Sequence, residues 1–575
     1  MKYVLIVLLL AGACIGVGWA AHQSGVPAGP ALSNYVPAGA LLYLETKDFS
    51  SLLSSWNGSS EKQNWVKSDN YEVFSRSRLF LRLKEASDQF TVAAGLPPDM
   101  NFLTQVAGKR SAIALYDIGK LQFLYVTKLA SASSMQTALW QTRAKFETRS
   151  VGNVNFYFRR DPESEREVAF AISGDYLLLA TREDLMAGAL QLLGGSKDRT
   201  IEGEEWWSQV ATSTGSPADL RMVLNLEKIV PSPYFRSYWI QQNITDMKQY
   251  RAAVADLFLS ANGYREERVL LRKTASGEQK STDQNAAAVA ELVRLTPSSA
   301  GVYEVKANPT SDFCFNLLES KLLEPHIGPA VVEQIAPQVQ LASGETGSGT
   351  DLETRIDQVP VQSATSKDNS KAVKALFDKN PVHAVLQTQT TERDKDGVFV
   401  RIHTAIALLG DADWDEKTVQ STLVDFVRPG LTAGHLGVDW QAKSGYQELD
   451  GLWTFTSAVR GKYLMIADDP GLLAGLLANL NQKAPLAPAV FVAGFSHTRE
   501  RQNFGRLAVL LDTRGELPRA QDGLGKAPGQ GGNPQFFSGN IRSFSAALSG
   551  VSSERIIVRE SGEKVLQTVT YEWSQ

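Results

Sequence analysis

The chain repeats part of its own sequence. Residues 174–193 and 461–480 lie 287 positions apart and share nine of twenty aligned residues. Both segments read Gly-x-Tyr-Leu-x-x-Ala and then continue into a leucine-rich helical pattern. The same spacing relates 267–272 to 554–559, 220–224 to 507–511, and Pro231 to Pro518. Because internal repetition is typical of duplicated structural units, we expect two copies of one fold.

A further pair of segments opens each copy. Residues 37–43 resemble residues 297–303, and each segment is followed by Asp-Phe and a Leu-Leu pair. Here the spacing is only 260, so the second copy holds about 27 more residues before the 287 spacing begins. A stretch rich in Ser, Thr, Gly and Asp at about 341–371 is the expected place for this insertion. We therefore predict a first repeat over 31–280 and a second over 281–575.

The apolar patterns predict a mixed secondary structure. Short runs of Val, Ile, Leu, Tyr and Phe predict strands at 40–46, 111–116, 121–128, 168–173, 176–181, 384–392, 398–408, 462–467, 555–559 and 566–573. Helical patterns occur at 71–94, 135–146, 183–193 and 416–427, the last between a capping Asp415 and a stop at Pro429. An Asp-Gly pair at 396–397 predicts a hairpin, and a Gly-rich flexible loop is expected at about 519–536. Since strands follow one another directly, the fold class is α+β with antiparallel sheets.

One uncharged apolar stretch stands at the N-terminus. Lys2 precedes 19 residues without a charge, from Tyr3 to Ala21. This length lies between a cleavable signal sequence and a membrane-spanning helix, so both remain open. We therefore treat residues 1–30 as a signal peptide or membrane-anchoring apolar helix plus a short linker. The expected location is the periplasm or cell envelope, with the body outside the cytoplasm.

Cysteine use and charge limit the alternatives. The body after the apolar stretch holds only Cys314, which lies in an apolar helical pattern, so it can form no internal disulfide. An exported body of this size without disulfides favours a bacterial envelope. The net charge of -4 is spread without a basic stripe, and this argues against nucleic acid as a partner.

Two of these segments resemble a known group of proteins. The opening Pro-Ala-x-Ala-Leu-x-Tyr strand pattern at 37–43 and the Gly-x-Tyr-Leu-x-x-Ala pattern at 174–180 are similar to those of a family of exported bacterial proteins of unknown function. The resemblance covers about 60 residues. It implies an envelope location and supplies no catalytic residues, and the polar insertion departs from the pattern.

Catalytic motifs fail on their spacing. Ser59-x-x-Lys62, Ser68-Asp69-Asn70 and Lys443-Ser444-Gly445 follow the order found in penicillin-recognising enzymes. The first two lie only a few residues apart, whereas that fold needs a helical subdomain between them. Ser59 also sits in a polar turn, which does not suit a nucleophile at the start of an apolar helix.

Metal and cofactor motifs are equally weak. Asp411, Asp413 and Asp415 alternate as in a calcium loop, but Glu416 and Thr422 occupy positions that require Gly and Glu, so we interpret them as a helix-capping turn. The histidines lack zinc-site spacing; they are His22, His326, His383, His403, His435 and His497. Trp206-Trp207 is expected to place one indole in the core, and the cluster Glu163, Glu165 and Glu167 to decorate a hairpin tip. We name no catalytic, metal-binding or cofactor-binding residue.

Three function classes follow from this sequence. The first is a non-enzymatic envelope protein that binds or scaffolds an unknown envelope protein, with the membrane as a further partner if the apolar stretch is retained. The second is a module that binds a small molecule or lipid in a cleft between the repeats. The third is a hydrolase whose catalytic residues converge only in the folded chain. A cavity lined by apolar residues at the interface between the repeats would favour the second class.

Overall fold

The structure is a computed structural model, and it assigns the described residues to two compact units. It describes residues 31–573 apart from 68–70, 72–73, 77, 212–217, 234–246, 261, 274–281, 324–366, 394–399, 432–437, 484–488 and 504–549. Unit 1 takes the chain up to Gln279 and again from Phe504, and unit 2 spans Lys280–Asn503. The N-terminal apolar stretch, most of the polar insertion and the Gly-rich loop lie outside the described residues.

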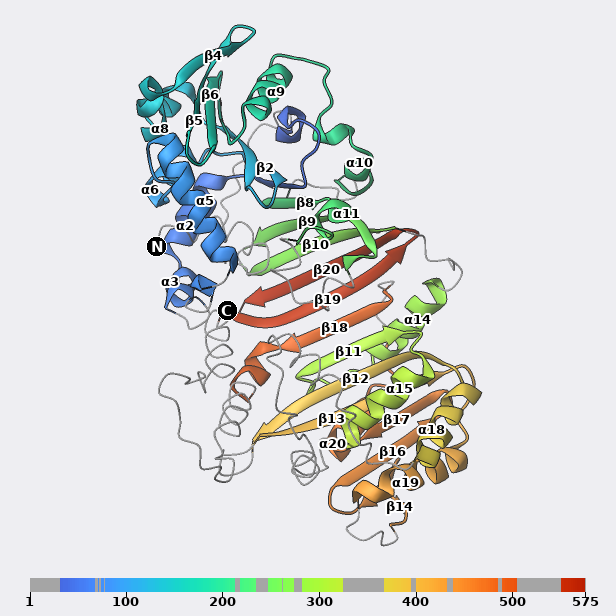
Figure 1. Cartoon of the computed structure of the whole chain (residues 1–575). Helices are drawn as coiled ribbons and strands as arrows, with labels where there is room; N and C mark the ends of the chain where they lie inside the picture. Colours follow the sequence, from blue (N-terminus) through green and yellow to red (C-terminus); the bar gives the residue numbers. More distant parts are fainter. Residues whose placement is uncertain are drawn as a thin grey trace, which may run out of the picture. The chain divides into compact units, whose positions relative to one another are not determined.

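The fold is α+β with antiparallel sheets, as the sequence predicts (Figure 1). In unit 1 neighbouring strands follow the order β4-β5-β6-β7-β3-β2-β1-β8-β9-β10-β20-β19, and every pairing is antiparallel. The bounds of these strands are β1 Leu42–Thr46, β2 Ser111–Asp117, β3 Gln122–Lys128, β4 Glu147–Val151, β5 Val154–Arg160, β6 Glu167–Ser173, β7 Tyr176–Ala180, β8 Leu220–Leu224, β9 Tyr250–Ser260, β10 Gly263–Arg272, β19 Val551–Ser561 and β20 Lys564–Trp573.

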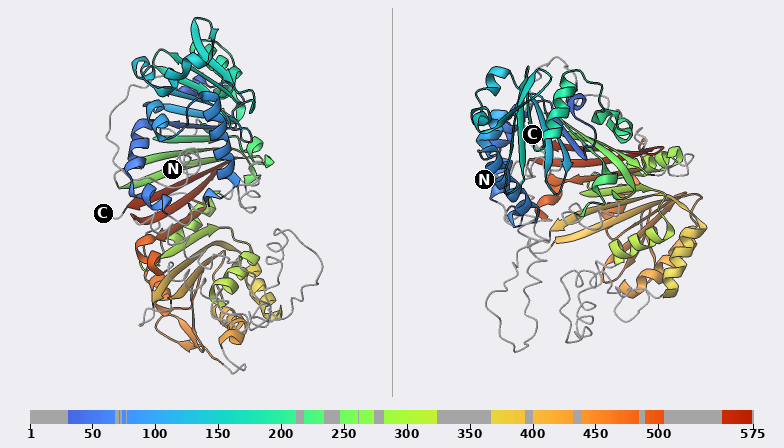
Figure 2. Two further views of the ribbon diagram at one scale, coloured as in Figure 1. Left: turned by 60° about the vertical axis from the view of Figure 1, so that its left-hand side comes forward. Right: turned by 45° about the horizontal axis from the view of Figure 1, so that its top comes forward.

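Helices cover both faces of the unit 1 sheet (Figures 1 and 2). One face packs against α9 and α10 around the buried Tyr43, Leu124 and Leu178. The opposite face lies under α2, α5 and α6, with Phe90 and Phe102 in its core. The bounds of the helices are η1 Leu32–Tyr35, α2 Phe49–Gly58, α3 Ser60–Val66, α5 Arg78–Ala94, α6 Met100–Val106, α7 Ser131–Ser134, α8 Ala138–Gln141, η2 Thr142–Lys145, α9 Glu183–Leu193, η3 Ile201–Gly203, α10 Glu205–Ala211 and α11 Leu226–Ile229.

Unit 2 has its own antiparallel sheet. Its neighbouring strands follow the order β14-β15-β16-β17-β13-β12-β11-β18. The bounds are β11 Val302–Ala307, β12 Val382–Arg393, β13 Val400–Gly410, β14 Gln441–Ala442, β15 Gln447–Asp450, β16 Thr454–Arg460, β17 Tyr463–Ala467 and β18 Phe491–Ser496, with helices α14 Thr282–Val293, α15 Ser311–Leu318, η5 Glu319–Leu323, α18 Lys367–Lys379, α19 Glu416–Leu431 and α20 Pro470–Ala478. Phe315, Phe377 and Phe426 fill the core under α15, α18 and α19.

The C-terminal hairpin β19–β20 lies in unit 1. β20 pairs with β10 over nine residues, from Gly263 opposite Glu572 to Leu271 opposite Lys564. The sequence-based boundaries placed all of 281–575 in one repeat, so this pairing returns the end of the chain to the first unit. Alternation of apolar side chains along a strand carries no information about which partner strand it meets, because any exposed edge can accept it.

Several local expectations need adjustment. The helix expected at 135–146 is limited to α8 and the 3₁₀ turn η2. Helix α19 starts after Asp415, which accepts a hydrogen bond from the Thr418 amide at 3.3 Å, but it continues past Pro429 to Leu431. β12 and β13 form the expected hairpin, while the Asp-Gly turn itself lies outside the described residues. The strands that the apolar patterns did not predict are β4, β5, β8, β9, β10, β11, β14, β15, β16 and β18.

Candidate functional site

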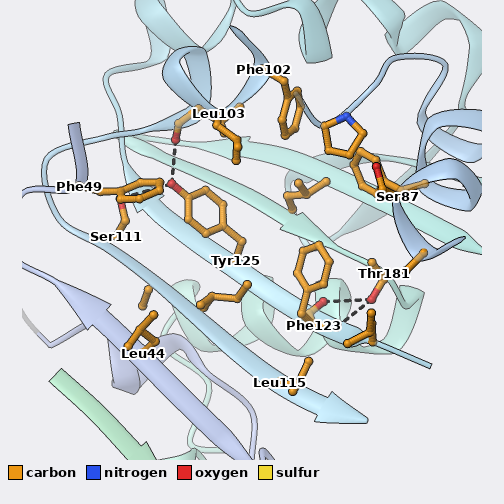
Figure 3. Close-up of a pocket in the computed structure, with 18 of the residues that line it drawn as sticks. Leu44, Phe49, Ser87, Phe102, Leu103, Ser111, Leu115, Phe123, Tyr125 and Thr181 are labelled. Carbon is orange, nitrogen blue, oxygen red and sulfur yellow. Dashed lines mark hydrogen bonds between the residues drawn. The ribbon is translucent and has the colours of Figure 1, made fainter. Parts of the chain in front are cut away.

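An apolar cavity of about 170 Å³ lies in unit 1 between the sheet and helices α2, α5 and α6 (Figure 3). Its floor is formed by β1, β2, β3, β7 and β8. The lining residues are Leu42, Leu44, Thr46, Phe49, Ala86, Ser87, Phe90, Pro98, Phe102, Leu103, Val106, Ser111, Ala112, Ile113, Leu115, Leu121, Phe123, Tyr125, Arg166, Leu179, Thr181 and Leu220. Concave sites with this apolar character are typical of binding sites for small apolar ligands.

The register of the strands explains why the floor is apolar. Leu44 of β1 lies opposite Ile113 of β2, which lies opposite Tyr125 of β3, and Tyr125 lies opposite Leu179 of β7. Because side chains alternate across a strand, these cross-strand neighbours share one face. The intervening residues of β2 and β3 face α9 and are buried, whereas Ile113, Leu115 and Phe123 remain partly exposed. These partly exposed apolar side chains are the ones that line the cavity.

The helices supply the aromatic roof. Phe90 of α5 and Phe102 of α6 are buried and contact each other with ring centroids 6.0 Å apart. Phe49 follows the N-cap Asp48 of α2 and meets the ring of Tyr125 at 6.4 Å. The sequence places these aromatic residues at the starts or on the inner faces of short helices, so they hold the helices above the sheet.

Few polar groups line the cavity, and those of Tyr125 and Thr181 are hydrogen-bonded within the protein. The Tyr125 hydroxyl donates to the Val106 carbonyl at 2.8 Å and lies 3.3 Å from the Ser111 hydroxyl (Figure 3). Burial raises the pKa of Tyr125 to about 12. The Thr181 hydroxyl accepts from the Phe123 amide at 2.8 Å. Because these partners are already used, the cavity wall presents mainly carbon atoms to a ligand.

A second, polar cavity adjoins the apolar one. The two share Ala86, Arg166 and Thr181 in their linings. The polar cavity is also lined by the charged side chains of Arg82, Glu85, Lys120, Arg160, Glu165, Glu167, Arg182 and Asp184. Arg166 therefore stands where an apolar space meets a charged one.

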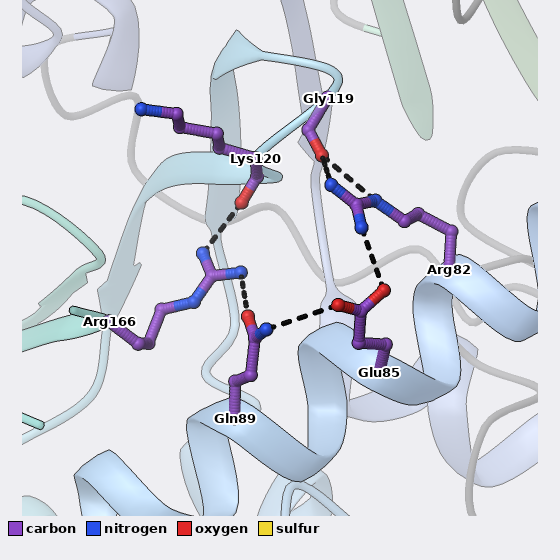
Figure 4. A network of polar contacts seen from close by, with 6 residues as sticks. All are labelled: Arg82, Glu85, Gln89, Gly119, Lys120 and Arg166. Atoms are coloured by element: carbon purple, nitrogen blue, oxygen red, sulfur yellow. Dashed lines mark hydrogen bonds and ion pairs between the residues drawn. The ribbon is translucent and has the colours of Figure 1, made fainter. Parts of the chain in front are cut away.

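A hydrogen-bonded network organises this boundary (Figure 4). Arg166 donates to the Lys120 carbonyl at 2.6 Å and to the Gln89 side chain at 3.0 Å. Gln89 donates to Glu85 at 3.3 Å, and Glu85 accepts from Arg82 at 2.7 Å. The Arg82 guanidinium also donates twice to the Gly119 carbonyl, at 3.0 and 3.2 Å, which ties helix α5 to the β2–β3 turn.

Two residues beside the boundary, Leu121 and Glu165, have an unusual backbone conformation with positive φ. Leu121 has φ +49°, in the left-handed region that non-glycine residues avoid. Its side chain lines the apolar cavity, and its carbonyl lies 3.5 Å from the Arg166 guanidinium. Strained backbone of this kind occurs preferentially at functional sites.

The residues of the penicillin-recognising pattern have other partners. The Ser59 hydroxyl caps α3 by accepting from the Lys62 amide at 3.1 Å and donates to the Trp56 carbonyl at 2.9 Å. The Lys62 ammonium donates to Asn57 at 2.5 Å. Lys443 belongs to unit 2, where it pairs with Glu448 at 3.2 Å, and 68–70 lie outside the described residues.

The acidic and histidine candidates have separate partners. His383 pairs with Asp411 at 3.0 Å, Asp415 caps α19, and His403 lies 3.3 Å from Glu392. His497 packs against the Phe495 ring. Among the residues that the structure describes, no three His, Cys, Asp or Glu side chains gather as metal ligands. His22, His326 and His435 lie outside them.

The tryptophan pair and the acidic hairpin residues lie in unit 1. Trp207 is buried and meets Tyr43 edge-on at 5.1 Å, whereas Trp206 is partly buried and donates to Glu204 at 3.0 Å. Of the acidic hairpin residues, Glu165 pairs with Arg160 at 3.2 Å, while Glu167 accepts from the Glu183 amide at the start of α9.

Cys314 is buried in unit 2, as its apolar surroundings in the sequence predict, and burial raises the pKa of its thiol to about 12. Within the described part of the chain, no helix is both long and apolar enough to cross a bilayer.

Comparison with known proteins supplies no family. No family model and no curated protein matches the chain. Crystal forms IV, III and I of TP0453 are similar over 41%, 43% and 44% of this chain and 79%, 81% and 83% of theirs, at 11%, 12% and 12% identity and a TM-score of 0.22. A similarity this low carries no argument about fold or function.

Proposed function

We propose that the chain is an exported, non-enzymatic protein whose first unit binds a small apolar molecule. The observation that carries this proposal is the cavity between the unit 1 sheet and helices α2, α5 and α6. The apolar N-terminal stretch supports an extracytoplasmic location, because such stretches direct export. Binding, rather than catalysis, is supported by a wall that is mainly apolar.

The size of the cavity limits the ligand. A dry engineered protein cavity of about 150 Å³ holds one benzene molecule. At about 170 Å³, this cavity suits a single ring or a short alkyl chain. All of its lining residues belong to unit 1, so this site differs in place from the cleft between repeats that the sequence suggested.

Duplication of one unit accounts for the order of the strands, and we propose it as the origin of the fold. The order of these strands is β4-β5-β6-β7-β3-β2-β1-β8 in unit 1 and β14-β15-β16-β17-β13-β12-β11-β18 in unit 2. Each unit 2 strand therefore takes the place of the unit 1 strand whose number is ten lower. The hairpins β9–β10 and β19–β20 correspond in the same way. Their starts, Tyr250 and Val551, and Gly263 and Lys564, are both 301 residues apart.

The strand order revises one sequence alignment that suggested duplication. The 287 spacing matched part of β10 with part of β19, whereas the strand order makes β20 the counterpart of β10. The matches at 507–511 and Pro518 lie outside the described residues. Spacing 287 does relate β6 to β16 and β7 to β17, whose bounds agree residue for residue.

Isothermal titration calorimetry with toluene, a neutral molecule with a single ring, tests the binding proposal. We expect saturable binding of toluene to the whole chain. Ala86→Phe should abolish it, because Ala86 lines the cavity and a phenyl ring would occupy that space. Val92→Phe is the matched control, since Val92 is 55% exposed on the same helix α5. Binding that is absent from the wild type, or equal in the two variants, contradicts the proposal.

A protein-binding scaffold remains a second candidate. Helix α5 exposes Leu81 and Val92 at 56% and 55%, which are large apolar side chains for a surface. They are scattered singly, so they favour a protein partner less strongly than the cavity favours a small molecule.

A further inference from the structure

We propose that the ligand of the unit 1 cavity is a small anionic amphiphile, and that Arg166 binds its carboxylate where the apolar and polar cavities meet. This inference rests on the proposed binding function and adds the charge of the ligand to it. The apolar part would lie between β3 and α6, and the head group would face the polar cavity.

The apolar and polar cavities of unit 1 share a boundary. An amphiphile needs an apolar space that continues into a polar one, and Ala86, Arg166 and Thr181 line both spaces here. Of these three, Ala86 offers no polar side-chain atom and the Thr181 hydroxyl is engaged with Phe123. The guanidinium of Arg166 is therefore the charged group that a ligand in the apolar cavity would meet first.

The polar cavity is lined by more positively than negatively charged side chains. Three of its arginines have a carboxylate partner: Arg82 with Glu85, Arg160 with Glu165, and Arg182 with Asp184. The fourth acidic side chain, Glu167, accepts from the Glu183 amide instead. Among the described residues, Arg166 and Lys120 form no ion pair. The cavity therefore keeps a positive surplus, which an anion would neutralise.

The hydrogen bonds of Arg166 use only part of its guanidinium. Its hydrogen bonds go to neutral oxygens, namely the Lys120 carbonyl and the Gln89 side chain, both drawn in Figure 4, and the Leu121 carbonyl. A guanidinium has five N–H donors in a planar fork, so these three contacts leave donors for a ligand. Gln89 and the β2–β3 turn hold the side chain in place, which reduces the entropy lost on binding.

Burial and the neighbouring Arg82 lower the pKa of Arg166. An arginine nevertheless remains protonated at neutral pH. A partly buried cation beside another cation is stabilised by an incoming anion more than an exposed one would be, since the local dielectric is low. This favours a carboxylate over a neutral head group.

Octanoate and 1-octanol provide the direct test, because they share a chain length and differ in the charge of the head. Each is titrated against the whole chain by isothermal titration calorimetry at pH 7. We expect octanoate to bind about tenfold more tightly than octanol, as charge-assisted hydrogen bonds to a carboxylate would allow. The preference should weaken at high salt.

Three variants assign the preference to Arg166. Arg166→Gln should reduce octanoate binding about tenfold and leave octanol binding unchanged. Arg166→Lys keeps the positive charge and should retain part of the preference. Lys84→Gln removes a charge from an exposed residue of α5 that lines neither cavity, so it should change octanoate binding less than twofold. Thermal unfolding of each variant shows that it is folded.

The outcomes separate this inference from the proposed function. If toluene binds, but octanoate and octanol bind equally tightly to the wild type, the anionic head is wrong and the apolar site stands. If octanoate binds better, but Arg166→Gln and Lys84→Gln lower its affinity equally, Arg166 is not the specific contact. Failure of toluene to bind the wild type contradicts both proposals.

Discussion

The rings of Tyr264 on β10 and Tyr571 on β20 stack with their centroids 4.3 Å apart, and the two residues lie directly opposite each other in the register. They join segments that are more than 300 residues apart in the chain. An aromatic cross-strand pair contributes beyond its buried area. The C-terminal hairpin is therefore a packed part of unit 1.

A double-mutant cycle measures this stacked pair. We expect Tyr264→Ala and Tyr571→Ala each to lower the free energy of unfolding, with a coupling energy of about 0.5–1.5 kcal/mol between them. Urea unfolding followed by tryptophan fluorescence provides the values. Strictly additive effects would mean that the rings do not interact.

Gly263 permits the close approach of the same two strands. A Cβ built on Gly263 would come 2.0 Å from the Tyr571 carbonyl oxygen. Gly263→Ala should therefore destabilise unit 1 by at least about 1–3 kcal/mol, because backbone atoms must shift. Gly58→Ala in α2 is the control, since a Cβ there meets no atom within 4 Å. Equal melting temperatures for the two variants would be inconsistent with β20 lying against β10.

Arg221 and Asp256 form a bidentate ion pair across β8 and β9, with both N–O distances 2.7 Å. Asp256 is fully buried. Asp256→Ala should cost about 3–5 kcal/mol, because it leaves the Arg221 charge in a low-dielectric site without its partner. Replacing both residues, as Arg221→Met with Asp256→Leu, should restore most of that loss. Glu147→Ala at an exposed pair is the control and should cost no more than about 1 kcal/mol.

Alkaline unfolding reports on Tyr125 in the cavity wall. Its pKa is about 12 in the folded chain and about 10 when unfolded, so the folded state retains the phenol proton over this interval. The stabilisation is complete below pH 10 and is lost as the pH rises to 12, by up to about 1.4 kcal/mol per pH unit. Tyr125→Phe should be less stable at pH 7, because Val106 loses a donor, yet show a shallower decline above pH 10. An unchanged slope would place the phenol in contact with solvent.

The sequence predicts the fold class because strand alternation is a local property. β1, β2, β3, β6 and β7 were all anticipated from runs of apolar residues. The partners of these strands depend on which edges are left open, and this explains why β20 pairing with β10 was not foreseen.

The cavity could not be predicted from the sequence for a different reason. Ile113, Leu115 and Phe123 alternate along their strands as core residues do, and only the reach of the opposing helices decides whether such a face is filled. Arg166 lies beside Glu163 and Glu165 in the sequence. This run of charged residues indicated a solvated hairpin. The contact of Arg166 with Gln89 depends on α5 crossing that hairpin, and no local signal reports this.

If unit 1 contains an apolar space able to hold a small molecule, xenon should enter it, since xenon occupies dry apolar cavities of this size. A crystal structure of the whole chain under xenon pressure shows whether it does. We predict ordered xenon among Tyr125, Phe102 and Leu115. Density showing those side chains packed together, with no xenon between β3 and α6, would contradict the proposed binding site in unit 1.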